Sequence, residues 1–212
     1  MGKELILEWS RSYILDHWGR VFSIAVLVFT GFYIHWPFLS GGPGSFIMAW
    51  MRFFHFVGAY ALILGLVVRV YMAFNSRFDS DWKDFGISIN LKNLPHQVLY
   101  YLFLKEDHPV YRKYNPLQAF AYMGVGLMIL FIFLTGCALY HGKIFGFIKA
   151  PDSFQWINSL LGGESYTRIW HFLFMWGFIL FSFVHVYMSL LMTAVEKDRT
   201  FSSIFTGYKL KR

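Results

Sequence analysis

The residues in this sequence that are best suited to chemistry are histidines placed in long apolar stretches. The chain has eight histidines, and five of them fall within or at the ends of such stretches: His17, His35, His55, His171 and His185. An ionisable side chain inside a membrane costs free energy, so each of these five is a candidate functional residue. The other three, His96, His108 and His141, lie in or beside polar loops and are interpreted as structural.

His171 and His185 have an informative spacing, because 14 residues separate them. In an α-helix this separation is about 40° short of four full turns and about 21 Å along the axis. Both side chains therefore lie near one helix face, at two different depths. Haem iron accepts a histidine at each axial position, so this pattern is typical of a helix that contributes one ligand to each of two stacked haems.

Four apolar runs must position these histidines. They cover about residues 13–39, 50–74, 117–140 and 169–195, and a membrane-spanning helix needs about 20 residues. Helices are expected because lipid cannot satisfy a lone backbone amide. The predicted fold class is therefore all-α, an integral membrane four-helix bundle in one domain over residues 1–212.

The polar connections between the spans carry weaker signals. In the connection over residues 75–116, the segment Leu94 to Leu104 is predicted to form a short helix that lies in the membrane interface. Residues 37–45 and 141–168 are predicted to be loops on the opposite side.

The composition agrees with a membrane protein and excludes several other classes. Hydrophobic residues make up 57% of the chain and charged residues 15%, whereas about a quarter of a soluble domain is charged. The net charge of +7 does not indicate nucleic-acid binding, because the basic residues lie at the ends of the apolar runs. Cys137 is the one cysteine, which excludes an iron–sulfur cluster or an internal disulfide within this chain.

The distribution of lysine and arginine predicts the orientation. With the N-terminus inside, 15 of the 19 basic residues lie on the inner side, and only Arg52, Lys143, Lys149 and Arg168 lie outside. Cytoplasmic loops carry an excess of these residues. Both termini are therefore expected in the cytoplasm.

This topology restricts which histidines can share a depth. His17 begins the first span on the inner side, and His55 begins the second span on the outer side. The fourth span runs inward, so His171 is outer and His185 is inner. The permitted pairs are His17 with His185 and His55 with His171.

Other interpretations remain open at this point. His35 follows His17 by 18 residues, which is five helical turns, so it could replace His55 in the outer pair. Isolated histidines can also be core residues bonded to backbone carbonyls. Zinc or copper would suit imidazole, but two pairs about 20 Å apart do not form one compact metal site.

Arginines and glycines near the spans give further, less specific signals. Arg20 and Arg69 lie near inner helix ends and could pair with haem propionates, because a guanidinium matches a carboxylate. The positions of Arg20 and Arg69 are explained equally well if their side chains extend to place the charged group at the membrane–water interface. Glycine would let a flat macrocycle approach the backbone, but it also serves helix packing; the glycines concerned are Gly19, Gly31, Gly58, Gly65, Gly124, Gly126, Gly136 and Gly177.

Several segments resemble the b-type cytochrome subunits of membrane-bound nickel–iron hydrogenases, over nearly the whole chain. They are Asp16–Arg20 (DHWGR), Thr30–Tyr33, Arg52–His55, Val68–Phe74 (VRVYMAF), Tyr100–Leu104 (YYLFL), Tyr114–Leu117, Thr135–Tyr140, His171, His185–Met188 (HVYM) and Gly207–Tyr208. The wider superfamily includes the cytochrome b subunits of formate dehydrogenases and thiosulfate reductases. It shares the paired histidines, whereas the VRVYMAF, YYLFL and HVYM segments favour the hydrogenase subunits.

The resemblance implies specific roles for residues of this chain. His17, His55, His171 and His185 would be the axial ligands of two haem b groups, which favours His55 over His35. The inner haem would reduce menaquinone or another quinone. Asn115, at the inner start of the third span, is a candidate for the quinone pocket, although a helix cap before Pro116 is the simpler interpretation.

The resemblance also implies a multisubunit complex in the inner membrane of a bacterium or archaeon. This complex could itself assemble into a higher oligomer. A small iron–sulfur subunit and a large nickel–iron subunit would dock on the periplasmic side, against residues 37–45 and 141–168. This chain would transfer electrons and reduce quinone but would not cleave hydrogen. Two alternatives for the function are considered. The chain could be the cytochrome b subunit of a formate dehydrogenase or thiosulfate reductase, or it could be a haem-free membrane anchor or transporter.

Overall fold

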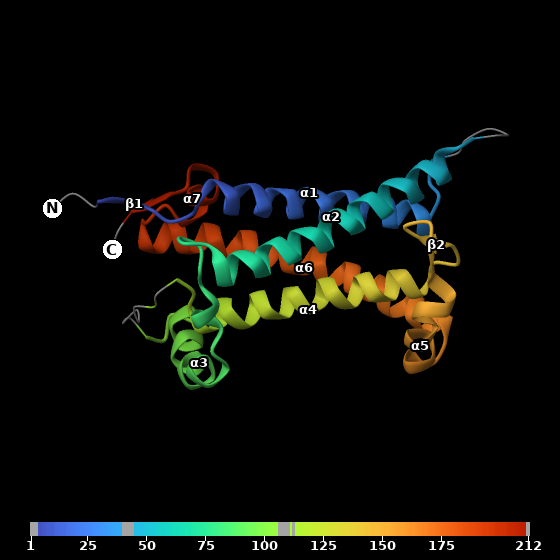
Figure 1. Ribbon diagram of the computed structural model, residues 1–212. Coiled ribbons are helices and arrows are strands. Elements are labelled where there is room, and N and C mark those ends of the chain that lie inside the picture. Colours follow the sequence, from blue (N-terminus) through green and yellow to red (C-terminus); the bar gives the residue numbers. More distant parts are fainter. Residues whose placement is uncertain (1–3, 40–44, 106–110, 112, 211–212) are drawn as a thin grey trace.

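Four long helices form the body of the protein in the computed structural model, which describes residues 4–39, 45–105, 111 and 113–210. They are α1 (Arg11–His35), α2 (Ile47–Asn75), α4 (Pro116–Ala138) and α6 (Glu164–Glu196). Each is long and apolar enough to cross a membrane. Successive long helices run in opposite directions (Figure 1). The predicted all-α membrane bundle is confirmed, and each helix lies within a few residues of its predicted span.

The helices begin where their sequences supply caps. The Ser10 hydroxyl accepts the backbone N–H of Tyr13 at the start of α1. At the start of α4, Asn115 and Gln118 form a reciprocal capping box, and Pro116 occupies the first turn, where it loses no hydrogen bond. The capping interpretation of Asn115 is confirmed.

Short elements close the end of the bundle that holds both ends of the chain, here called the terminal end. Strand β1 (Leu5–Leu7) pairs antiparallel with β4 (Tyr208–Leu210), which follows α7 (Thr200–Thr206). The turn η1 (Trp82–Phe85) precedes α3 (Ile87–Tyr101). The predicted short helix in this connection thus exists, but it begins seven residues earlier than expected and includes Pro95.

The opposite end, here called the distal end, holds a feature that the sequence did not reveal. Residues 141–168, expected to be a loop, contain the hairpin β2 (Lys143–Ile144) with β3 (Ile148–Lys149) and the helix α5 (Ala150–Leu161). Helix α5 is too short to span a membrane. It buries Ile157 and leaves Trp156 exposed, and such an amphipathic helix gives a weak hydropathy signal. The loop prediction was wrong for this segment.

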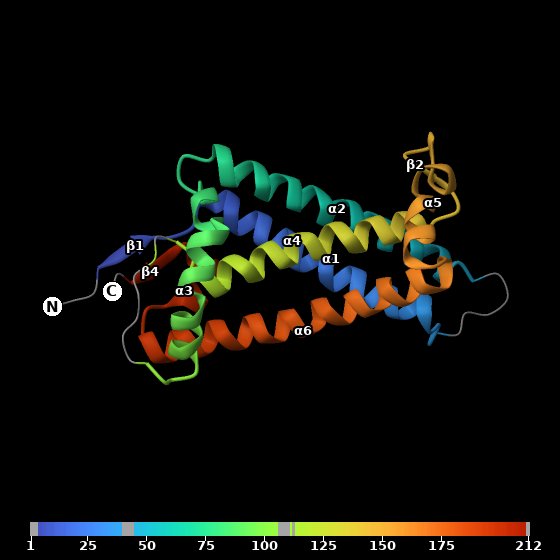
Figure 2. The same ribbon diagram turned by 90° about the horizontal axis from the view of Figure 1, so that it is seen from below.

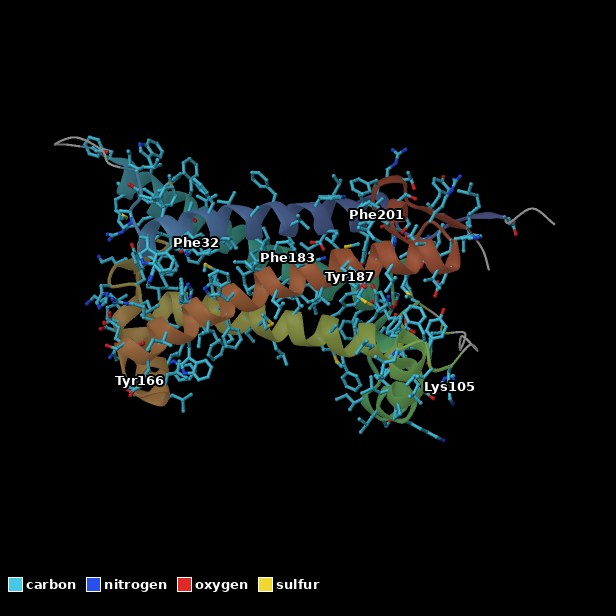
Figure 3. All side chains as sticks on the ribbon, turned by 180° about the vertical axis from the view of Figure 1, so that it is seen from behind. Phe32, Lys105, Tyr166, Phe183, Tyr187 and Phe201 are labelled. Carbon is cyan, nitrogen blue, oxygen red and sulfur yellow. The ribbon has the colours of Figure 1, made fainter. Side chains whose placement is uncertain are left out.

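The four long helices of the bundle are not equally close. Helix α1 packs closely along α2, while α4 contacts both α6 and α2 less extensively (Figure 2). The core at the middle of the bundle is apolar and is formed by Leu62, Ile129 and Phe178, each at most 4% exposed. On the outer face of α6, in contrast, Phe183 is 73% exposed and Tyr187 is 62% exposed (Figure 3). Such large exposed apolar side chains over the spans are suited to lipid contact.

Candidate functional site

Four histidines of the spans face one another in two pairs. The ring centres of His17 and His185 are 6.3 Å apart, and so are those of His55 and His171. The first pair joins α1 to α6 near the terminal end, and the second joins α2 to α6 near the distal end. All four side chains are half-buried.

The equal spacing of the two pairs fits one metal ion between the rings of each. A metal–imidazole bond is about 2.0 Å, and the ring centre lies about 1.1 Å behind its nitrogen, so two rings on one ion have centres about 6.2 Å apart. Among the described residues, no three His, Cys, Asp or Glu side chains gather around one point. The histidines therefore meet as two separate pairs, the arrangement that two bis-histidine haems need.

An apolar layer separates the two pairs. Phe178 lies seven residues from both His171 and His185 on α6, and Leu62 lies seven residues beyond His55 on α2. Together with Ile129 of α4, these residues form the buried core at mid-bundle. The pairs thus lie on either side of a layer of large apolar side chains, about 21 Å apart along α6.

His35, the alternative partner for His171, has a different environment. It is the last residue of α1 and is exposed. Its ring stacks on Phe172, with ring centres 4.5 Å apart, and meets the edge of Trp36. The ring that faces His171 is that of His55.

The two candidate propionate partners differ in how fully they are engaged. Arg20 makes two hydrogen bonds to one carboxylate oxygen of Asp16, at 2.7 and 3.0 Å. Arg69 forms an ion pair with the fully buried Asp81 and donates to the Tyr114 hydroxyl at 3.1 Å. The Nη1 of Arg69 is buried and has no partner among the described residues. Arg69 therefore keeps a buried donor that an additional carboxylate could accept.

The candidate quinone residue, Asn115, has both polar atoms engaged. Its Oδ1 accepts the N–H of Gln118, and its Nδ2 donates to the Tyr101 hydroxyl at 2.6 Å. On the neighbouring helix α3, Gln97 is fully buried, and neither polar atom of its side chain has a partner among the described residues. Gln97 was not identified from the sequence, because burial of a glutamine in a polar connection leaves no signal there.

Of the remaining histidines, His108 lies outside the described residues. His96 lies on α3. His141 is exposed and has its Nε2 3.3 Å from a Glu164 oxygen. Neither His96 nor His141 faces another histidine within the described part of the chain.

Two threonines contact the distal histidine pair, and neither was singled out as a site residue from the sequence. The Oγ1 of Thr30 is 2.9 Å from His55 Nδ1, and the Oγ1 of Thr135 is 3.0 Å from His171 Nδ1. Each threonine precedes a glycine. The repeated Thr–Gly dipeptide, near the distal end of two different spans, is the one signal from which they could have been found.

A cluster of tyrosines and charges connects the terminal histidine pair to the polar connections. The hydroxyls of Tyr13 and Tyr114 are 3.0 Å apart, and the Tyr114 ring packs against Tyr122, which in turn lies near His185. Burial raises the pKa of Tyr114 well above its ordinary value. Burial also lowers the pKa of the neighbouring Lys113, which lies 3.8 Å from an Asp79 oxygen.

Comparison with known proteins identifies what this arrangement resembles. The family model described as prokaryotic cytochrome b561 matches residues 8–207. A probable Ni/Fe-hydrogenase B-type cytochrome subunit of Azotobacter vinelandii is 30% identical over 226 residues, covering 99% of this chain and 92% of the relative. The corresponding protein of Cupriavidus necator is 32% identical, covering 92% of this chain and 83% of the relative. The probable Ni/Fe-hydrogenase 1 B-type cytochrome subunit of Escherichia coli is 30% identical, with coverage of 91% and 86%.

Proposed function

The chain belongs to the prokaryotic cytochrome b561 family, and we propose that it carries electrons between a nickel–iron hydrogenase and the membrane quinone pool. It would do so as one di-haem domain over residues 1–212, as the b-type cytochrome subunit of the complex. The observation that carries this proposal is the presence of two facing histidine pairs, each with ring centres 6.3 Å apart, at two depths of the bundle.

The ligand assignment follows from these pairs. His55 and His171 would hold the distal haem, and His17 and His185 the terminal haem. Haem held by two imidazoles supplies low-spin, one-electron chemistry without an open position for oxygen. The exposure of His35 and its stacking on Phe172 support His55 as the ligand. Both arginines already pair with a carboxylate, Arg69 with Asp81 and Arg20 with Asp16. The buried Nη1 of Arg69, which has no partner among the described residues, supports Arg69 as a propionate partner.

The orientation and partners follow from charge and from the relatives. The excess of basic residues near β1, β4 and α3 supports a cytoplasmic terminal end. The distal end, with β2, β3 and α5, would then face the periplasm and bind the iron–sulfur and nickel–iron subunits. The names of the relatives favour a hydrogenase over a formate dehydrogenase or a thiosulfate reductase.

Quinone reduction is proposed for the terminal end. Asn115 would reach a quinone oxygen only by exchanging its bond to Tyr101, because both of its polar atoms are engaged. A haem-free anchor or transporter does not explain two matched pairs of half-buried imidazoles.

The test is a dithionite-reduced minus oxidised difference spectrum of the purified complex, with a pyridine haemochrome count. We expect two b-type haems per chain. His55→Ala and His185→Ala should each lower the count by one or more, whereas His35→Ala, the matched control, should leave it at two. A folded, complete preparation without haem would refute the proposal, and haem loss in the His35 variant alone would refute the pairing.

The partner is tested separately. Affinity purification of the tagged chain from its native membrane should recover a nickel–iron and an iron–sulfur polypeptide together. Recovery of a molybdenum enzyme in their place would assign the module to a formate dehydrogenase or thiosulfate reductase.

A further inference from the structure

We propose that Thr30–Gly31 and Thr135–Gly136 form a duplicated clamp that fixes the tautomer and orientation of the two distal histidines. The inference rests on the proposed function, in which these histidines bind haem, and it assigns residues that act through the ligands. The threonines and glycines are therefore positioning residues for the distal haem.

The two halves of the clamp have the same construction. Helix α1 supplies Thr30 to the His55 ring of α2, and helix α4 supplies Thr135 to the His171 ring of α6. In each case the histidine comes from the helix packed against the one that carries the threonine. The two threonines are fully buried or nearly so, at 3% and 0% exposed.

The direction of each hydrogen bond follows from the second contact of the threonine. The Thr30 hydroxyl donates to the Val26 carbonyl at 2.7 Å, and the Thr135 hydroxyl donates to the Phe131 and Ile132 carbonyls at 3.0 Å. A hydroxyl has one hydrogen to donate and two lone pairs to accept with. We infer that this hydrogen is directed at the carbonyl, in which case the ring Nδ1 donates to the hydroxyl oxygen.

A histidine that donates through Nδ1 leaves its Nε2 unprotonated, and this is the atom that can bind a metal. Nδ1 faces the threonine, so Nε2 lies on the other side of the ring. Partners of this kind fix the orientation of metal-binding histidines and raise their basicity as ligands.

The glycines allow each histidine ring to approach the backbone of the neighbouring helix that carries the Thr–Gly dipeptide. A Cβ at Gly31 would lie 3.4 Å from His55 Cε1, and a Cβ at Gly136 would lie 3.2 Å from His171 Cε1. Both contacts involve the ring carbon between the two nitrogens. The Thr–Gly dipeptide thus supplies a hydroxyl acceptor and an open backbone surface to the same edge of one imidazole.

The terminal pair lacks this construction and serves as an internal reference. His17 stacks on Trp18, and His185 stacks on Phe181. Within the described part of the chain, no hydroxyl lies within hydrogen-bond distance of either ring. Removing the threonine hydroxyls should therefore change the distal haem and leave the terminal haem unchanged.

The experiment compares Thr30→Val, Thr135→Val and the double variant with the wild type by spectroelectrochemical titration and by low-spin haem EPR. The distal haem is identified as the signal lost in His55→Ala. In the double variant its midpoint potential should rise, because weaker donor ligands stabilise the oxidised iron less. The expected change is about tenfold in the ratio of reduced to oxidised haem at a fixed potential, which is 59 mV for one electron.

Matched variants separate the hydroxyl from general effects on folding. Thr167→Val is the control, because Thr167 is also fully buried near the distal end and donates to a carbonyl four residues earlier, that of Gly163. Its potentials should equal those of the wild type. The double variant Thr30→Ser and Thr135→Ser keeps both hydroxyls and should restore the wild-type potential.

Each outcome decides the inference. Valine variants that hold both haems with unchanged potentials and EPR signals would overturn the clamp while leaving the proposed function intact. Loss of the distal haem in the valine double variant, with retention in the serine double variant, would support the clamp. Equal loss in both would overturn it. A wild-type chain without haem would instead refute the proposed function.

Discussion

Substitution of Gly136 by alanine tests how closely the distal site is packed. Gly136 lies in the last turn of α4, and a Cβ added there would be 3.2 Å from Cε1 of His171. Carbon atoms pack best at about 3.5–4.0 Å, so the imidazole must retreat by about 0.3–0.8 Å. The ring is already held by the hydroxyl of Thr135 at 3.0 Å, so it cannot retreat without weakening that bond.

Two opposing terms decide the sign of the effect. Overpacking of this kind costs about 1–3 kcal/mol, while alanine in place of glycine favours the helix by at most about 1 kcal/mol. The net expectation is a loss of about 0–3 kcal/mol. Gly19, which is exposed on α1 with nothing within 4 Å of a Cβ, is the matched control. Gly19→Ala has only the helix term and should gain up to about 1 kcal/mol.

The assay is thermal unfolding of the haem-loaded protein in detergent, followed by loss of the haem absorption band. The two variants should differ by about 1–3 kcal/mol in unfolding free energy, and 1 kcal/mol shifts the midpoint by about 2–4 °C in a chain of 150–250 residues. Gly136→Ala should also lose distal haem at a lower temperature than the wild type. If Gly136→Ala matches Gly19→Ala in both midpoint and haem retention, the close-packing argument is wrong.

Three further predictions concern the terminal end. Asp81→Asn should destabilise the protein by about 3–5 kcal/mol, because it leaves the charge of Arg69 buried and unpaired; Glu164→Gln, which breaks an exposed pair, should cost at most about 1 kcal/mol in the same denaturation assay. Gln97→Leu should be neutral or stabilising by up to about 3 kcal/mol, since it removes two buried polar atoms without partners; loss of quinone-dependent haem oxidation in a stable variant would show a ligand role instead. Burial raises the folded-state pKa of Tyr114, so its contribution to stability is complete below its unfolded value of about 10 and is lost as the pH rises through the folded value. Tyr114→Phe should therefore flatten the alkaline part of a stability–pH curve, and an unchanged curve would contradict the burial argument.

The long elements of this fold could be predicted because lipid imposes a simple rule on sequence. A helix that spans the membrane must be apolar along its whole length, so hydropathy alone locates α1, α2, α4 and α6. Helix α5 has no such constraint, and its short amphipathic sequence does not distinguish it from a loop. The pairing of β1 with β4 joins residues about 200 positions apart, and the short apolar run Leu5–Leu7 does not by itself indicate its partner.

The histidine pairs could be predicted for a related reason. Depth along a span follows from residue number and direction, so His17 with His185 and His55 with His171 are the pairs that topology allows, and these rings face one another in the structure. The choice between His35 and His55 depended on helix rotation, which sequence periodicity alone did not settle. The threonine contacts depend on the packing of neighbouring helices, which no pattern within a single span records.

The position of the apolar core bears on how such a chain could move electrons without leaking protons. Leu62, Ile129 and Phe178 fill the middle of the bundle, between the two histidine pairs. A buried water or ion among these three side chains would have no polar partner in them and would cost several kcal/mol. If the pairs hold haem as proposed, electrons could pass between the two cofactors across this layer, which is a poor path for protons because protons need polar carriers. The hydrogen-bonded hydroxyls of Tyr13 and Tyr114 and the ion pair of Arg69 with Asp81, which could handle protons, lie at the terminal end, on one side of the layer. Proton uptake beside these groups would take place on the side where quinone is proposed to bind, which is the condition for charge separation across the membrane.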